Sequence, residues 1–200
     1  MERSLTYLPN NYYHIYNRGI NKREIFFDKN DWKHFQTLLY TRNSTKRIDS
    51  TRVKRLPLHK IDRGETIVDL AAYVLMPNHF HLLLKEKVEG GISSFMGKLG
   101  TAYSMYINTK YERSGPLMCR PYRSKYIDSD EYMRWVLSYI HMNPVKKNPN
   151  ISQLNNYHYS SYPDYYQPNR PESTIINKEC LPFSFQELED INSMLNILEN

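Results

Sequence analysis

The spacing of hydrophobic residues divides most of the chain into two kinds of segment. Four segments alternate in polarity or stay apolar over the length of a strand: residues 12–18, 67–76, 79–85 and 120–127. Three other segments repeat apolar residues at helical spacing: residues 30–41, 92–107 and 131–142. Pro77-Asn78 is typical of a turn and separates the second strand from the third.

The order of these elements is strand, helix, strand, strand, helix, strand, helix. It predicts an α+β fold of the ferredoxin-like (RRM-like) kind, with a four-stranded antiparallel sheet and two helices on one face. The opposite face then remains open for a ligand or for the third helix. We expect residues 1–165 to form one domain. Residues 166–200 would be a tail packed on it, with a short helix capped by Ser184.

Composition excludes several classes of protein. The chain has 200 residues, of which 40% are hydrophobic, so it can build a core. Its longest apolar run, residues 68–76, is too short to span a membrane, and residues 1–10 lack the apolar core of a signal peptide. Two cysteines are too few for a disulfide framework or a four-cysteine zinc site. We therefore expect a cytoplasmic protein that does not contact membranes.

The positive charge is concentrated in one segment. Residues 42–63 contain eight Lys or Arg and two Asp, which accounts for the whole net charge of +6. Such a segment is typical of proteins that bind a polyanion, because lysine and arginine displace counterions from phosphates. A solvated loop would have the same composition. The 18 tyrosines can stack on nucleic-acid bases or pack in half-buried sheets.

Two histidines share one face of the predicted third strand. Side chains alternate along a strand, so His79 and His81 lie on one face, and Phe80 and Leu82 lie on the other. If the apolar side chains pack against the helices, both imidazoles stand on the open face. There they can bind a metal ion or a phosphate, or they can be ordinary surface histidines.

The last predicted helix carries a tyrosine and an asparagine one turn apart. Tyr139 and Asn143 are four residues apart and so lie on the same helical face. A helix across the open sheet face would bring a phenol and an amide oxygen next to the two imidazoles. Two histidines and one amide oxygen leave positions open on a metal ion for water and phosphate. Alternatively, Asn143-Pro144 is a simple helix stop and Tyr139 a packing residue.

Two stretches of the chain resemble a known family. AAYVLMPNHFHLLL (71–84) and YIHMNPVKK (139–147) are similar to the single-tyrosine HUH transposases of small bacterial insertion sequences. The asparagine-proline-valine ending most resembles their REP-associated tyrosine transposase branch. Three further pieces follow in the family's order: residues 13–19, 114–127 and 158–162.

The resemblance implies a chemistry and a substrate. Tyr139 would be the nucleophile that nicks and rejoins single-stranded DNA at hairpin-flanked sites through a 5′-phosphotyrosine, as in DNA transposition. Mg²⁺ or Mn²⁺ would be held by His79, His81 and Asn143, a position where the insertion-sequence branch usually has glutamine. The predicted fold then has a catalytic helix on the open face of the sheet.

Several basic or polar residues are candidates for contacting DNA. Two groups are defined by charge, one in the basic segment (Arg47, Arg52, Lys54, Arg55) and one on the predicted fourth strand (Arg120, Arg123, Lys125). The strand group can equally be a solvated edge. Asn17 and Arg18 match a recurrent family motif and are either DNA-contacting or structural.

Other functions remain open at this level. The same fold serves RRM-like nucleic-acid-binding modules, but these carry aromatics where this chain has His79 and His81. A domesticated protein that binds hairpins without transposition, and a replication initiator or relaxase, would have similar residues. The sequence also leaves open whether the protein is a homodimer or a monomer, and whether Tyr139 acts in cis or in trans.

Overall fold

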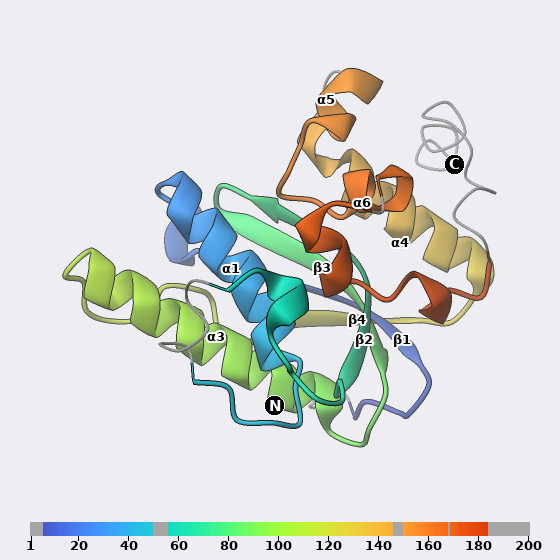
Figure 1. Ribbon diagram of the computed structural model, residues 1–200, viewed down its shortest axis with the longest axis horizontal. Coiled ribbons are helices and arrows are strands. Elements are labelled where there is room, and N and C mark those ends of the chain that lie inside the picture. Colours follow the sequence, from blue (N-terminus) through green and yellow to red (C-terminus); the bar gives the residue numbers. More distant parts are fainter. Residues whose placement is uncertain (1–5, 50–55, 146–149, 168, 184–200) are drawn as a thin grey trace.

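The four strands form one antiparallel sheet. In the computed structural model, which describes residues 6–49, 56–145, 150–167 and 169–183, the strand order is β2-β3-β1-β4 (Figure 1). The strands are β1 (Tyr12–Arg18), β2 (Val68–Met76), β3 (His79–Glu86) and β4 (Arg123–Ile127). All three neighbouring pairs are antiparallel. This arrangement confirms the predicted α+β, ferredoxin-like fold.

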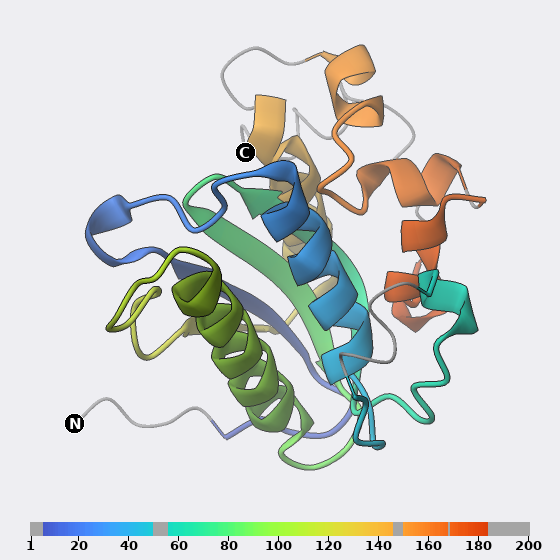
Figure 2. The ribbon, with the colours of Figure 1, turned by 60° about the vertical axis from the view of Figure 1, so that its left-hand side comes forward.

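Helices α1 (Lys29–Arg42) and α3 (Gly91–Lys110) lie side by side on one face of the sheet (Figure 2). Together with that face they enclose the larger hydrophobic core, which contains Phe35, Phe80 and Tyr103. Phe80 projects from β3 into this core, as the alternation predicts. Full burial of a phenylalanine side chain such as Phe35 or Phe80 is worth roughly 1.5–3 kcal/mol of transfer free energy.

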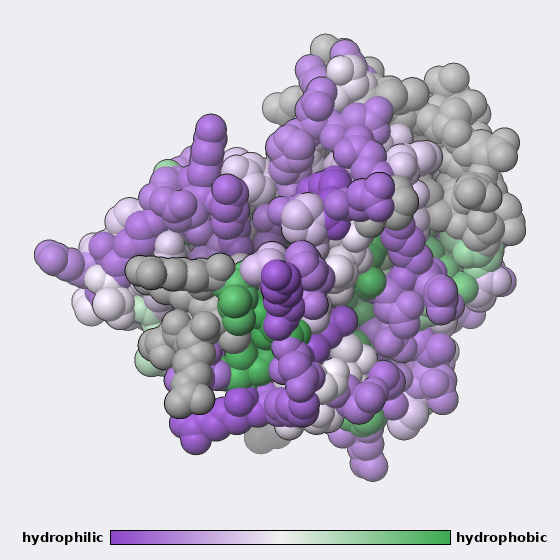
Figure 3. Space-filling view, viewed as in Figure 1, coloured by the Kyte–Doolittle hydropathy of each residue, from purple (hydrophilic) through white to green (hydrophobic). Residues whose placement is uncertain are grey.

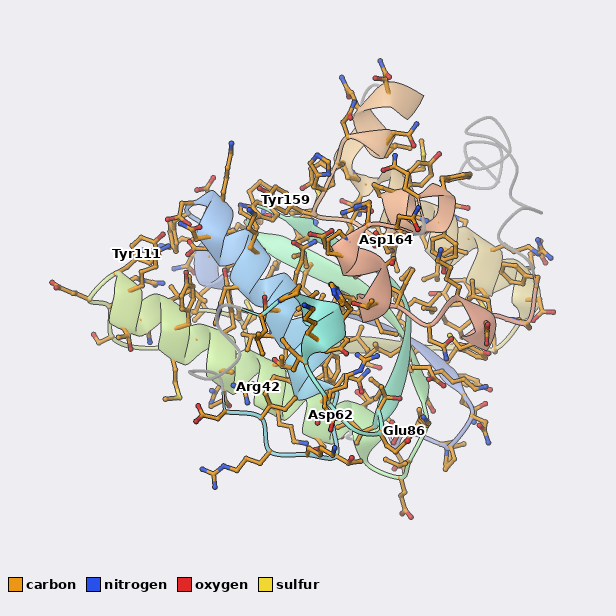
Figure 4. The ribbon with its side chains drawn as sticks, viewed as in Figure 1. Arg42, Asp62, Glu86, Tyr111, Tyr159 and Asp164 are labelled. Atoms are coloured by element: carbon orange, nitrogen blue, oxygen red, sulfur yellow. The ribbon has the colours of Figure 1, made fainter. Side chains whose placement is uncertain are left out.

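Side-chain carboxylates fix the first turns of both helices. Asp28 caps α1 in a capping box with Asp31. Glu86, at the end of β3, accepts hydrogen bonds from the backbone N–H groups of Gly91 and Ile92 and so caps α3 (Figure 4). A Cβ atom at Gly91 would lie 2.3 Å from the Ile67 carbonyl oxygen, so only glycine fits there.

Helix α4 (Asp130–Met142) packs on the opposite face of the sheet. Its apolar side chains, including Val136, Leu137 and Ile140, form a second core with residues of β2 and β3. Ser129 caps the helix by accepting a hydrogen bond from the Tyr132 N–H. The third predicted helix is therefore the one that covers part of the open face.

Residues 157–167 and 169–181, which we call the wrap, lie along the outer edge of β2. Three backbone hydrogen bonds join the two: Leu75 N–H to Tyr159 O, Ser161 N–H to Tyr73 O, and Asn177 N–H to Leu70 O. Figure 4 labels Tyr159 and Asp164 on this segment. The wrap contains three short helical segments, α6 (Tyr162–Tyr166), η4 (Pro171–Ile175) and η5 (Lys178–Cys180). It packs on the same sheet as the rest of the chain.

The remaining elements are short. They are the 3₁₀ turns η1 (Ile20–Lys22), η2 (Leu58–Lys60) and η3 (Asn143–Val145) and the helix α5 (Ile151–Asn155). The face of the molecule seen in Figure 3 is mostly hydrophilic, with apolar residues confined to small areas. No helix among the described residues is long and apolar enough to cross a membrane.

Of three expectations, one needs correction and two concern segments that lie partly or wholly outside the described residues. The fourth strand begins at Arg123, not Arg120, because Pro121 has no N–H to donate to a strand ladder. The basic segment has no helix or strand over residues 43–49, and over residues 56–63 it has only the short turn η2; Lys46 pairs with Asp62 across these two parts. The short helix expected after Ser184, like the basic residues Arg52, Lys54 and Arg55, lies outside the described residues.

Candidate active site

Strand β3 presents two histidines on the face that α4 covers. His79 is half-buried, and His81 is 6% exposed. Their ring centroids are 5.2 Å apart. Their neighbours Phe80 and Leu82 point into the core on the other face, so the predicted separation of the two faces is confirmed. The pair is thus held by a strand that is fixed from behind by the main core.

Both imidazoles use the same ring nitrogen for a contact within the protein. Nδ1 of His79 lies 2.6 Å from Oδ1 of Asn78, and Nδ1 of His81 lies 2.9 Å from Nε2 of His14. In the tautomer with the proton on Nδ1, each histidine keeps the lone pair of Nε2 for another ligand. Histidines that bind metal ions are usually held in this way by a hydrogen bond to the other nitrogen.

Helix α4 brings Tyr139 to the histidines. The Tyr139 ring is edge-on to His81, with centroids 5.3 Å apart, and its centroid is 6.0 Å from that of His14. On its other side Tyr139 stacks on Trp135, with centroids 5.1 Å apart and planes 11° apart. Trp135 is one turn earlier on the helix, so the helical period orients the phenol ring.

Asn143 completes the group at the C-terminal end of α4. It has helical backbone angles at the C-cap, one turn after Tyr139. A side-chain hydrogen bond with Asn143 contributes to the electrostatics of His79, so the amide and the imidazole meet. The structure therefore brings together two imidazoles and one amide, as the sequence pattern predicted.

This donor set is compatible with a divalent cation that keeps open positions for water or phosphate. No cluster of three or more His, Cys, Asp or Glu suited to a metal ion occurs within the described ranges. The two histidines and Asn143 are not a cluster of that type, because the third donor is an amide oxygen. An amide oxygen in place of a carboxylate leaves the site without a negative charge, which suits a phosphate substrate.

Burial favours the neutral form of two of these histidines, His14 and His79. Burial lowers the pKa of His14 to about 4, with a further contribution from Lys125. Burial also lowers the pKa of His79, and the charge of Arg18 adds to this effect, whereas the hydrogen bond with Asn143 opposes it. Near neutral pH both rings are therefore uncharged and have a lone pair to offer.

Comparison with protein families identifies the kind of protein. Residues 8–143 match the family model described as "Transposase IS200 like". The chain belongs to the IS200-like transposase family. The match includes both histidines, Tyr139 and Asn143, and it confirms the resemblance noted in the sequence. No curated protein matches the sequence.

Comparison with solved structures shows that the fold of this chain occurs in another transposase. The structure of a REP-associated tyrosine transposase bound to a REP hairpin aligns with a TM-score of 0.58 and 15% identity, over 86% of this chain and 89% of that one. A putative transposase from Deinococcus radiodurans aligns with a TM-score of 0.39 and 15% identity, over 67% and 92% of the two chains. A tRNA(His) guanylyltransferase from Saccharomyces cerevisiae gives 0.41 and 13%, over 99% and 80%. The last two scores are too low to indicate a shared fold.

Three basic residues of the family member surround the histidines. Arg18 is opposite His79 in the β1–β3 ladder, and its charge acts on that ring. Lys125 is opposite His14 in the β1–β4 ladder, and Arg123 is opposite Tyr16. Because partners across a ladder share a face, all three lie on the face that carries the histidines. All three are exposed.

Three other predicted DNA contacts, Asn17, Arg47 and Arg120, lie within the described residues, and no strand ladder places them on this face. Asn17 donates a hydrogen bond from Nδ2 to the Cys119 carbonyl and accepts one from the Arg18 N–H, which favours the structural alternative for this residue. Arg47 is exposed and follows the end of α1, a helix that packs on the opposite face of the sheet from the histidines. Arg120 is exposed but precedes β4.

The sequence pattern missed His14, Tyr16 and Trp135. All three rings contact the site: His14 and Tyr16 stack on His81, and Trp135 stacks on Tyr139. Two signals were available. His14 and Tyr16 alternate on β1 away from the core residues Tyr13 and Ile15, and Trp135 is four residues before Tyr139.

Proposed function

We propose that this IS200-like transposase nicks and rejoins single-stranded DNA by transesterification, with Tyr139 as the nucleophile. The observation that carries the proposal is the Tyr139 ring, edge-on to His81 at 5.3 Å between centroids, on a helix whose next turn carries Asn143. A phenol next to two imidazoles and an amide is suited to attack on a phosphodiester.

The proposed step exchanges one phosphate ester for another. The Tyr139 oxygen attacks the phosphorus, the bond from phosphorus to the 3′ oxygen breaks, and the 5′ phosphate stays on the tyrosine. The phenol loses its proton and the departing 3′ oxygen gains one, so the step neither consumes nor releases a net proton. Because the ester bond is conserved, a second 3′-OH can attack the phosphotyrosine and join two strands without ATP.

His79, His81 and Asn143 would hold Mg²⁺ or Mn²⁺. A bound divalent cation would polarise a phosphate oxygen and stabilise the charge that builds up during attack. The protein's part is to keep the two rings oriented, with Nδ1 of His79 engaged by Asn78 and Nδ1 of His81 engaged by His14. Stacking on Trp135 limits rotation of the Tyr139 ring.

The substrate is proposed to be a DNA hairpin with a single-stranded flank. The structural neighbour is a REP-associated tyrosine transposase bound to a REP hairpin, and the fold is shared. Arg18, Arg123 and Lys125 would contact phosphates around the scissile site. Tyr16, half-buried next to His81, offers a ring on which an unpaired base can stack.

The test is covalent adduct formation on a labelled pool of single-stranded hairpins with randomised flanks, in Mn²⁺, resolved on a denaturing gel beside a duplex control. Wild type should form an adduct on single strands, and Tyr139→Phe and His81→Ala should form none. Tyr132→Phe is the matched control, because Tyr132 lies on the same helix and also stacks on Trp135. It should form the adduct as wild type does.

Two results would contradict the proposal. An adduct that persists in Tyr139→Phe would mean that another residue is the nucleophile. Tight hairpin binding by wild type without any adduct would favour a domesticated hairpin-binding protein that has lost the chemistry.

A further inference from the structure

His14 is a third histidine in contact with the pair on β3. It lies on the adjacent central strand β1, and its Nε2 is 2.9 Å from Nδ1 of His81. The two rings are stacked, with centroids 5.0 Å apart and planes 28° apart. Both side chains are buried, His14 at 5% and His81 at 6% exposure. The proposed reaction uses only the presence of this contact, not the direction in which its proton points.

A hydrogen bond between two neutral imidazoles can be made in two ways. Either His81 donates from Nδ1 to Nε2 of His14, or His14 donates from Nε2 to Nδ1 of His81. In the first case Nε2 of His81 carries a lone pair. In the second it carries a proton and cannot bind a metal ion. The direction of this one bond therefore decides whether His81 can serve as a ligand.

The neighbouring histidine indicates which direction applies. Nδ1 of His79 lies 2.6 Å from a side-chain oxygen of Asn78, and an amide oxygen can only accept. His79 therefore has its proton on Nδ1 and its lone pair on Nε2. If His81 is to act with His79 on one ligand, it needs the same tautomer, which requires His14 to accept.

We propose that His14 is a positioning residue that accepts the Nδ1 proton of His81 and so keeps Nε2 of His81 available for the divalent cation. This inference rests on the proposed function, because it assigns His14 to the same metal-assisted site. Carboxylates often fill this supporting role in metal sites. An uncharged histidine does so without adding negative charge to a face that must accept phosphate.

The hydrogen bond can be tested in metal-free protein without DNA. In protein labelled with ¹⁵N at histidine, NMR reports the tautomer of each ring and the N–N coupling across an N–H···N bond. We expect the His81 proton on Nδ1 and a coupling from that nitrogen to Nε2 of His14. A His81 proton on Nε2, or a proton on Nε2 of His14 directed at His81, would overturn the inference.

Two variants of His14 distinguish the effect of its acceptor nitrogen from the effect of its stacked ring. His14→Phe keeps a ring stacked on His81 but removes the acceptor, whereas His14→Gln restores an acceptor oxygen. For metal binding measured without DNA, Tyr16→Leu is the matched control, because Tyr16 also stacks on His81, at 5.5 Å, without bonding to Nδ1. We expect Mn²⁺ affinity, measured by electron paramagnetic resonance of the free ion, to fall about 10- to 100-fold in His14→Phe. It should recover in part in His14→Gln and change little in Tyr16→Leu.

The results of these experiments distinguish a failure of the role of His14 from a failure of the proposed function. If wild type binds Mn²⁺ and forms the adduct, and His14→Phe folds and binds Mn²⁺ equally well, the role of His14 is refuted and the proposed function stands. If wild type neither binds Mn²⁺ nor forms an adduct, the proposed function fails, and the role of His14 fails with it. Thermal unfolding of each variant shows whether a lost affinity reflects a lost fold.

Discussion

Asp31 is a fully buried carboxylate that joins the start of α1 to the end of α3. Its oxygens accept hydrogen bonds from Lys110, Tyr106 and Tyr111, at 2.7, 3.0 and 2.8 Å, and from the Phe27 N–H at 2.9 Å. Burial by itself raises the pKa of Asp31, but the hydrogen bonds, first that from Lys110, outweigh it and hold the pKa below its ordinary value. The folded state therefore favours the ionised form.

Replacing Asp31 with asparagine should destabilise the protein by about 3 kcal/mol, because Lys110 loses its buried partner. A carboxyl group with a lowered pKa stabilises the fold above its unfolded pKa of about 4, and this contribution is lost as the pH falls through the folded pKa. Urea unfolding of wild type and Asp31→Asn should therefore differ at pH 7 and converge in acid. Asp62→Asn, at an exposed ion pair with Lys46, should change little. A difference between wild type and Asp31→Asn that persists unchanged in acid would contradict this account.

At the scale of elements, α4 is tied to β2 through the wrap. His141, on the buried side of α4, has Nε2 2.9 Å from the Ser161 hydroxyl oxygen. The same oxygen accepts a hydrogen bond from the Tyr73 N–H at 2.9 Å. Ser161 thus adds a buried hydrogen-bonded link between the helix that carries Tyr139 and the edge strand, beside their direct packing.

Substituting Ser161 with alanine should cost about 1–3 kcal/mol, because it leaves the Tyr73 N–H and the His141 ring without this partner in the interior. Chemical denaturation measures the loss, and hydrogen exchange of the α4 amides should accelerate. Ser94→Ala on the exposed side of α3 is the control and should unfold like wild type. Equal stability of the two variants would mean that water or a neighbouring group replaces the hydroxyl.

The elements and the face of each site residue could be predicted because they depend on local periodicity. Alternation along β3 separated His79 and His81 from Phe80, and the helical period placed Tyr139 with Asn143. The residues compared are only a few positions apart, so the geometry of a single strand or helix determines which face each side chain lies on.

What could not be predicted depends on pairings between distant segments. His14 meets His81 across 67 positions of sequence, and only the register of β1 against β3 brings them together. The pairing of the wrap with β2 could not be predicted from periodicity either. Its tyrosines act through their hydroxyl groups, Tyr157 donating to the Leu75 carbonyl and Tyr165 to the Ala71 carbonyl. Most tyrosines whose contacts are described pack or form hydrogen bonds within the protein. They therefore follow the packing interpretation rather than the base-stacking one.

For the whole molecule, the packing of α4 on the sheet of its own chain predicts that Tyr139 acts in cis. The second core joins Val136 and Ile140 of α4 to Val74 and Leu83 of the sheet. A mixture of Tyr139→Phe and His81→Ala proteins should therefore form no DNA adduct, because neither chain has a complete site. Adduct formation on the denaturing gel is the measurement, and wild type mixed with each variant is the control. An adduct in the mixture of the two variants would show that α4 is exchanged between copies.

The wrap has one more consequence, for how copies of this chain can associate. An uncovered edge strand is a template on which another chain can add a strand, and β2 would offer nine residues. The hydrogen bonds from the wrap use the outward groups of Leu70, Tyr73 and Leu75. The opposite edge, β4, is five residues long and carries Arg123 and Lys125, which disfavour stacking against an identical edge. Proteolysis within the wrap would thus do more than weaken the fold, since it would turn a protected sheet into a seed for aggregation.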